Sequence, residues 1–175
     1  MDYSAAPLAE PPFSSSPHSP LRVVLDSNVW IDILVFDDPT TRPILAAPEA
    51  RTLEALIDRR CLGELTRVLD YPQLVRFAVN KTAALATVAR LSTFVTPDTP
   101  EPAPPLPKCK DRDDQKFLEL AHAAHAAWLV SKDRAVLKLA KRIARDFAFR
   151  IAEPRPFVLA VEPHLSVPAQ AARDS

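Results

Sequence analysis

Acidic side chains stand at points of the sequence where a sheet would bring them together. Asp26 directly follows the short β-branched segment 21–25, and Asp133 comes two residues after the apolar segment 128–131. Ligand sites in open α/β sheets lie outside the carboxyl ends of the strands, so both carboxylates are expected at one edge. Two acids at strand ends are common, and a functional site therefore depends on further acids that reach the same edge.

A third acid, Asp114, is placed beside Asp133 by simple geometry. A helix over residues 114–127 advances about 20 Å, and a strand over residues 127–133 returns about 20 Å, so the two excursions cancel. Asp114 also lies on the same arc of its helix as Phe117. A carboxylate on the apolar face at a helix N-terminus is costly unless something there uses its charge.

Glu64 is the fourth acid, at the margin of the apolar stripe of its helix, and Asn28 adds an amide two residues after Asp26. Four carboxylates at one sheet edge would repel each other severely unless a hard divalent cation lay among them. Oxygen donors without sulfur or imidazole select Mg²⁺ or Mn²⁺ over Zn²⁺. Such a site activates water and neutralises the charge that builds up on a phosphodiester.

The elements that position these acids alternate between strands and helices. We predict strands over 21–25, 52–57, 94–95, 128–131 and 150–152, and helices over 29–36, 40–47, 60–70, 80–92, 113–126 and 133–147. Strand, helix and strand in repeated order predict an α/β fold with a largely parallel central sheet.

Composition sets the limits of the folded domain. The chain has 175 residues, 47% of them hydrophobic, which is enough for one domain with a buried core. Two stretches hold eleven of the nineteen prolines, one before Leu21 and one over 97–107. We expect a disordered Pro- and Ser-rich tail over 1–20, a folded domain over 21–160 that contains a stiff connector, and a frayed tail over 161–175.

Other features of the composition exclude classes of function. The single glycine, Gly63, excludes Gly-rich phosphate loops, and Cys61 and Cys109 lack the spacing of a zinc site. No apolar run approaches the ~18 residues of a membrane span, and the first residues lack the pattern of a signal peptide, so we expect a cytoplasmic protein. Lys and Arg (22) balance Asp and Glu (22), so local charge must hold any nucleic acid.

Four motifs in the same order carry a resemblance to a known family. They are LDSNVW at 25–30, RCLGELTRVL at 60–69, CKDRDDQKFLELA at 109–121 and WLVSKDRAVL at 128–137. Over about residues 21–156 the chain resembles the PIN-domain nucleases, and more narrowly the bacterial group described as toxin components of toxin–antitoxin pairs. One such motif alone is weak, whereas four in register are specific.

The resemblance implies a three-layer α/β/α sandwich and a Mg²⁺- or Mn²⁺-dependent endoribonuclease. Its catalytic acids would be Asp26, Glu64, Asp114 and Asp133, with the first, third and fourth on the metal and Glu64 acting on the attacking water. Asn28 and Ser131 would support them. The resemblance further implies products with 5′-phosphate and 3′-hydroxyl ends, a small antitoxin protein as partner and a homodimer.

The chain also departs from the pattern of that group. Its members often carry a further acid where Gln115 stands, Pro where Arg112 stands, and Gly at the positions of His125 and Lys132. These changes lower the local negative charge and disfavour a second metal ion.

Each acid also has a structural explanation. Asp26 and Asp133 are each suited to cap the helix that follows. The helix predicted over 113–126 has three candidates for its cap or first turn, which are Asp111, Asp113 and Asp114. We assign Asp114 to the metal, Asp111 to a cap or a supporting role, and Asp113 to solvent.

Two further alternatives stay open at this stage. A basic stripe on the helix over 133–147 is either a solvated face or a track for RNA phosphates that leads toward Asp133; it consists of Lys138, Lys141, Arg142 and Arg145. Further phosphate contacts would come from Lys110, Arg112, Lys132 and Arg134. A non-enzymatic module that binds RNA or protein on a degraded nuclease fold is the main rival function, supported by Gln115 and Arg112. A phospho-aspartate-type phosphotransferase is disfavoured, because Asn28 stands where that chemistry needs a second Asp.

Overall fold

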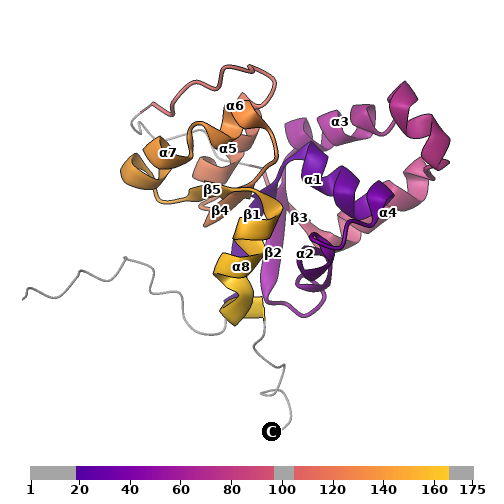
Figure 1. The fold of residues 1–175 in the computed structure, drawn as a ribbon, viewed down its shortest axis with the longest axis horizontal. Helices are drawn as coiled ribbons and strands as arrows, with labels where there is room; N and C mark the ends of the chain where they lie inside the picture. The colour runs from indigo at the N-terminus through magenta and orange to yellow at the C-terminus, as the bar shows by residue number, and fades with distance from the viewer. Residues whose placement is uncertain (1–18, 97–104, 166–175) are drawn as a thin grey trace, which may run out of the picture.

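The computed structural model describes residues 19–96 and 105–165, and its centre is a five-stranded parallel sheet. The strands lie in the order β3-β2-β1-β4-β5, as Figure 1 shows. Their bounds are Leu21–Leu25 for β1, Leu53–Ile57 for β2, Ser92–Phe94 for β3, Trp128–Val130 for β4 and Arg150–Ala152 for β5. In the central strand, Val24 pairs with Leu56 on one side and with Leu129 on the other. The predicted α/β fold with a parallel sheet is confirmed.

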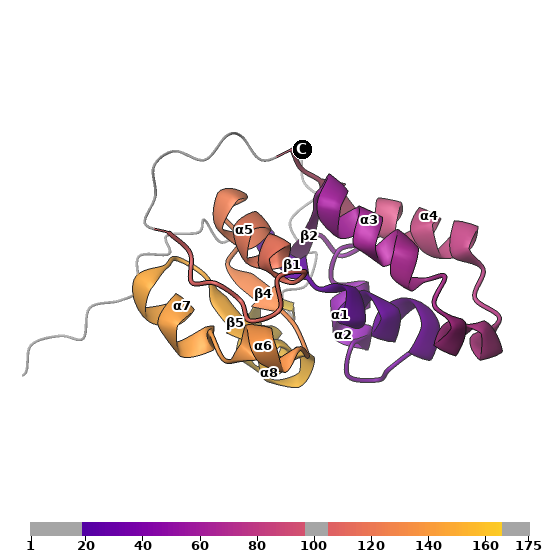
Figure 2. The ribbon, with the colours of Figure 1, turned by 90° about the horizontal axis from the view of Figure 1, so that it is seen from above.

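Helices cover both faces of this sheet. Figures 1 and 2 show α3 and α5 on one side of it and α2 and α8 on the other, which gives the three-layer α/β/α arrangement. The helices are α1 (Ser27–Ile31), the π-helix η1 (Asp32–Phe36), α2 (Arg42–Ala46), α3 (Arg59–Val68), the 3-10 helix η2 (Pro72–Phe77), α4 (Lys81–Leu91), α5 (Gln115–Ala123), α6 (Arg134–Leu137), α7 (Ala140–Asp146) and α8 (Pro154–Leu165).

The core lies between the sheet and its two helical layers. Parallel strands are covered on both faces, which explains why residues 23–25 of β1 and the whole of β4 are continuous apolar runs rather than alternating ones. Val23 and Val24 are fully buried, as is Phe117 on α5. On the other face, the Phe157 ring of α8 packs edge-on against Trp128, with the ring centroids 5.5 Å apart.

The predicted helices differ in their bounds from the observed ones, and two of them are divided. The helix expected over 29–36 is α1 followed by the π-helix η1. The helix expected over 133–147 is divided into α6 and α7, because the backbone N–H of Leu139 bonds to the carbonyl of Val136 and tightens the chain between them. The helix expected over 113–126 starts at Gln115 and ends at Ala123. His125 follows in the left-handed region with φ of 51°, which favours the Gly that the resembling group often has there.

Helix α8 was not predicted. Pro154 lies in its first turn, where a missing N–H is harmless, and Phe157 and Val161 bury one face at a spacing of four residues. The four-residue spacing of apolar side chains is the signal for this helix in the sequence, but three prolines in the same segment argue against a helix. The helix runs across the expected boundary at 160.

The expected tails fall mainly outside the described residues. Of the stretch 1–20, the structure describes Ser19 and Pro20, and of 161–175 it describes the end of α8. Residues 97–104 of the expected connector also lie outside. No helix in the described ranges is long and apolar enough to cross a membrane.

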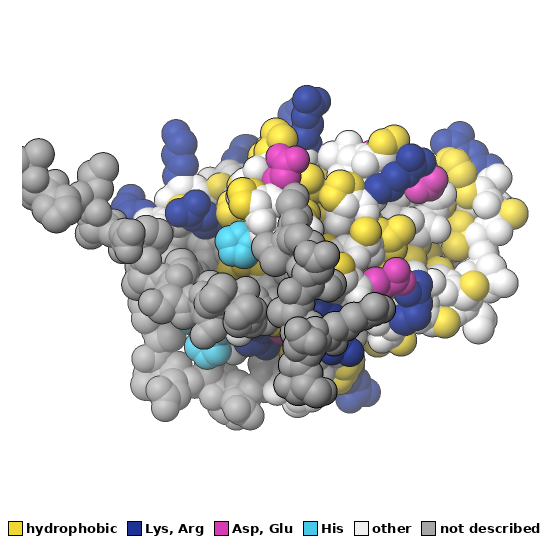
Figure 3. Space-filling model, turned by 90° about the horizontal axis from the view of Figure 1, so that it is seen from below, with side chains coloured by type: hydrophobic (Ala, Val, Ile, Leu, Met, Phe, Trp, Pro, Cys, Tyr) yellow, Lys and Arg dark blue, Asp and Glu magenta, His cyan; other side chains and the backbone are white. Residues whose placement is uncertain are grey.

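Charges of both signs are mixed on the molecular surface. On the face in Figure 3, where grey atoms do not cover it, Lys and Arg side chains project at several separate places, with Asp and Glu side chains beside some of them. The equal numbers of acidic and basic residues in the chain agree with this mixture. Any contact with RNA therefore depends on particular side chains near the site rather than on a field of one sign.

Candidate active site

Asp26 stands at the carboxyl end of the central strand and is only 3% exposed. Its backbone N–H donates to the carbonyl of Val130 (3.0 Å), which ties the end of β1 to β4. One carboxylate oxygen, Oδ1, accepts from the backbone N–H of Val29 (3.1 Å) and caps α1, while Oδ2 accepts from the Ser131 hydroxyl. The capping role and a functional role are therefore compatible, because they use different oxygens.

Asp133 lies on the next strand end and is linked to Asp26 through Ser131. The Ser131 hydroxyl oxygen accepts from the backbone N–H of Asp133 (3.0 Å) while the hydroxyl donates to Asp26. Oδ1 of Asp133 caps α6 by accepting from the N–H groups of Ala135 (2.7 Å) and Val136 (3.3 Å). One buried hydroxyl thus joins the Asp26 carboxylate to the backbone of Asp133.

Burial without a cation changes the acidity of Asp26. Desolvation raises the pKa of Asp26 to about 6, although the hydrogen bonds from Ser131 and Val29 act in the opposite direction; the charge of Asp133 raises it further. Asp26 therefore ionises less readily than an ordinary carboxyl group, and a bound cation would lower its pKa again.

Asp114 immediately precedes α5, and its side chain makes no cap hydrogen bond to that helix. Desolvation raises its pKa to about 7, and the charges of four acids add to the shift. In order of size these are Asp133, Asp111, Asp26 and Glu64. All the predicted catalytic acids are therefore close enough to repel Asp114.

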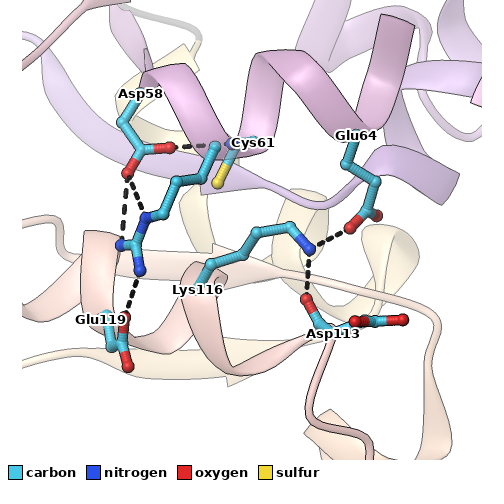
Figure 4. Close-up of polar contacts among 7 residues, drawn as sticks. Asp58, Cys61, Glu64, Asp113, Lys116 and Glu119 are labelled. Atoms are coloured by element: carbon cyan, nitrogen blue, oxygen red, sulfur yellow. Dashed lines mark hydrogen bonds and ion pairs between the residues drawn. The ribbon is translucent and has the colours of Figure 1, made fainter. Parts of the chain in front are cut away.

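Glu64 projects from α3 toward the same region and is held at both oxygens. Oε1 accepts from the Ser27 hydroxyl (2.8 Å), and Oε2 forms an ion pair with the Lys116 ammonium of α5, as Figure 4 shows. Neither Ser27 nor Lys116 was predicted, because their contacts depend on how α1 and α5 pack against α3.

The remaining predicted supporting residues differ in their contacts. Asn28 is exposed, and its side chain makes no hydrogen bond within the part of the chain that the structure describes. Asp111 accepts from the backbone N–H of Asp113 (2.9 Å), so it closes the turn before α5 rather than capping the helix. The Gln115 side chain accepts from the backbone N–H of Cys109 (2.6 Å) and donates to the carbonyl of Pro107 (3.3 Å).

The donor set fits a hard divalent cation. Within the described ranges, no three His, Cys, Asp or Glu side chains lie close enough together to hold one ion as they stand. Charge repulsion, however, acts over distances several times longer than a metal–ligand bond, and it raises the pKa of Asp114. A cation would relieve that repulsion, and carboxylate oxygens are the donors that Mg²⁺ and Mn²⁺ prefer.

A second acidic residue at a strand end, Asp58, was missed by the sequence analysis. It follows β2, is 3% exposed, and accepts from the backbone N–H of Cys61 (2.8 Å). Arg60 binds it (3.3 Å) and also reaches Glu119 on α5, so the group joins α3 to α5 (Figure 4). The signal that pointed to Asp26, an acid directly after a strand, was present here as well.

The predicted phosphate contacts surround the site unevenly. Lys132 forms an ion pair with the buried Asp32 of η1 (2.6 Å), another contact that sequence reasoning missed. Arg112 lines a pocket of about 550 Å³ near the start of α5, whose other cationic side chains are Arg60, Lys108 and Lys116. Lys110 and Arg134 are exposed.

A parallel α/β sheet with a cluster of acids outside its carboxyl edge defines the class of the fold. Comparison with protein families finds a match of residues 22–135 to the family described as the PIN domain. The chain therefore belongs to the PIN domain family, whose members are generally metal-dependent nucleases. Among curated proteins, none matches the chain.

Proposed function

We propose that the protein is a Mg²⁺- or Mn²⁺-dependent endoribonuclease. The observation that carries the proposal is the linkage of Asp26 and Asp133 through Ser131, with Asp114 within reach of their charges. Asp26, Asp114 and Asp133 would hold the divalent ion directly or through water. When bound, the ion would polarise the scissile phosphate and stabilise the leaving oxygen.

In this proposal, Glu64 acts on the attacking water. Its carboxylate is fixed by Ser27 and Lys116, so it can orient a water molecule and accept its proton without losing its own position. The caps that Asp26 and Asp133 make to α1 and α6 limit the movement of these two ligands. Pre-positioned ligands reduce the reorganisation that the reaction requires.

RNA phosphates would meet the exposed basic residues around the site. Lys110, Arg112 and Arg134 are exposed, whereas Lys132 is partly neutralised by Asp32. Contacts of this kind would position a strand without reading its sequence. We therefore expect single-stranded RNA to bind weakly and with strong dependence on salt.

Three further proposals rest on the sequence resemblance alone. They are that the protein is the toxin of a toxin–antitoxin pair, that a small antitoxin binds over the acidic edge, and that the protein forms a homodimer. Expression without a partner should then arrest growth. Normal growth, together with RNA cleavage by the purified protein, would indicate a housekeeping nuclease. A cytoplasmic location is proposed from the sequence itself, which has no apolar run of the length of a membrane span.

The direct test is cleavage of a labelled single-stranded RNA by the full chain. We expect cleavage with Mn²⁺ or Mg²⁺, none in excess chelator, and products with 5′-phosphate and 3′-hydroxyl ends. Robust cleavage by the metal-stripped protein would contradict the proposal. Binding of RNA with no cleavage under any metal condition would instead favour the non-enzymatic module.

A further inference from the structure

A buried ion pair connects the acidic site to the helix beside it. Lys116 lies in the first turn of α5, and its ammonium contacts Oε2 of Glu64 and donates to the backbone carbonyl of Asp113 (Figure 4). The two paired side chains are only 14% and 13% exposed. Exposed ion pairs hold their partners loosely, whereas a pair withdrawn from water keeps both groups in one geometry.

Glu64 is held from two sides by partners on different elements. Ser27 of α1 donates to Oε1 (2.8 Å), and Lys116 of α5 lies against Oε2. Oε2 is buried and has no hydrogen-bond donor in the described ranges besides that ion pair. The position of this carboxylate is therefore set before any ligand binds.

The other three acids of the site are not neutralised in this way. Within the residues that the structure describes, Asp26, Asp114 and Asp133 take part in no ion pair; Asp26 and Asp133 bind a hydroxyl and backbone N–H groups instead. Of the four acids, Glu64 alone has a cation beside it among residues 19–96 and 105–165. The three aspartates therefore remain to attract a divalent ion, whereas the charge of Glu64 is already compensated by Lys116.

We propose that Lys116 is a positioning residue that keeps Glu64 out of the coordination sphere of the divalent ion and leaves its carboxylate for the attacking water. The inference rests on the proposed function. Without the ammonium, the negative charge of Glu64 is no longer compensated and its side chain is free to turn toward Asp114. Glu64 then becomes a fourth ligand of the divalent ion. Removal of Lys116 therefore tightens metal binding rather than weakening it.

Calorimetric titration of the full chain with Mn²⁺ tests this inference without an activity assay. Lys116→Met should bind Mn²⁺ about tenfold more tightly than the wild type, because the Glu64 carboxylate is released and becomes a further ligand of the ion. Lys116→Arg should keep the affinity of the wild type. Lys81→Met is the matched control, since it removes the same charge and breaks the exposed pair that Lys81 of α4 forms with Asp70.

A double variant distinguishes an effect on Mn²⁺ affinity that acts through Glu64 from one that follows from the loss of a positive charge. If the gain in Lys116→Met acts through Glu64, it should disappear when Glu64→Gln is added. A gain that survives in the double variant overturns the inference, as does an unchanged affinity in Lys116→Met, and in both cases the proposed nuclease function stands. A wild type that binds no Mn²⁺ overturns the proposed function and this inference with it.

A second variant covers the case in which Lys116→Met does not fold. Ser27→Ala releases the other oxygen of Glu64 and should also tighten Mn²⁺ binding, by a smaller factor. Thermal melts in chelator establish which variants are folded. An Mn²⁺ affinity of folded Ser27→Ala equal to that of the wild type overturns the inference.

Discussion

Two strand ends of the sheet carry the same local design and lead to different results. Asp26 follows β1 and Asp58 follows β2; each is 3% exposed, and each caps the next helix with Oδ1. The difference lies at the other oxygen. Oδ2 of Asp58 faces Arg60, whereas Oδ2 of Asp26 faces the neutral hydroxyl of Ser131.

The neighbours decide which of the two strand ends can bind a cation. Arg60 satisfies the charge of Asp58 and also pairs with Glu119, so this group acts as a latch between α3 and α5. Around Asp26 the nearby charge, that of Asp133, is negative and raises its pKa. An acid that caps a helix thus does not by itself indicate a functional site. A buried acid without a positive partner does indicate one.

The largest expected effect is a contrast between two identical substitutions at these two positions. Asp26→Asn should lower RNA cleavage by roughly a hundredfold or more, because a metal ligand supplies several kcal/mol to the transition state. Asp58→Asn should leave cleavage within a few-fold and instead lower the free energy of unfolding by about 1 kcal/mol, through the loss of the Arg60 contact. Asparagine keeps both caps.

Cleavage assays and urea unfolding measure the two sides of that contrast. Folded Asp58→Asn without activity would show that the latch belongs to the active site. Asp26→Asn with full activity would show that the acid at the end of β1 is only a helix cap.

A smaller effect is expected at Asp114, whose neighbour Asp113 provides the control. In chelator, Asp114→Asn should raise the free energy of unfolding by about 1 kcal/mol, because it relieves repulsion from the other acids. Asp113→Asn should change it little, since Asp113 is exposed. Added Mn²⁺ should stabilise the wild type more than Asp114→Asn in thermal melts. If Asp114→Asn melts below the wild type and gains equally from Mn²⁺, Asp114 has a structural role.

The remaining expected effect is on the pH dependence of stability. Burial raises the pKa of Asp26 to about 6 and that of Asp114 to about 7, so above the ordinary carboxyl range the folded state binds more protons than the unfolded state. The free energy of unfolding in chelator should therefore fall as pH rises from about 4 to 7. Asp114→Asn should flatten the upper part of this slope. If the free energy of unfolding of the wild type instead rises between pH 4 and 7, folding does not raise the pKa values of these two acids.

The parallel sheet and the places of the strand-end acids in the sequence could be predicted because both follow from local pattern. Short β-branched segments such as residues 21–25, apolar from Val23 on, form buried parallel strands, and an acid directly after one lies at the carboxyl edge. The length of the 114–133 segment likewise limits where Asp114 can lie. These inferences need no knowledge of side-chain packing.

The pairing of charges could not be predicted, because it depends on tertiary packing. Lys116 meets Glu64 across 52 positions of the chain, and Arg60 meets Glu119 across 59. Any of several basic residues in the segment 108–116 had the right charge to meet Glu64, and nothing in the spacing selects Lys116. Prediction from sequence therefore reached the acids of the candidate site but not the cation that holds one of them.

A crystal structure of the full chain soaked with Mn²⁺ and a short uncleavable RNA tests the central claim most directly. We predict one anomalous peak at the carboxyl edge of the sheet, with oxygens of Asp26, Asp114 and Asp133 around it directly or through water, and a phosphate of the RNA beside it. An Mn²⁺ peak elsewhere on the chain, or RNA bound with no metal at these acids, would contradict the account.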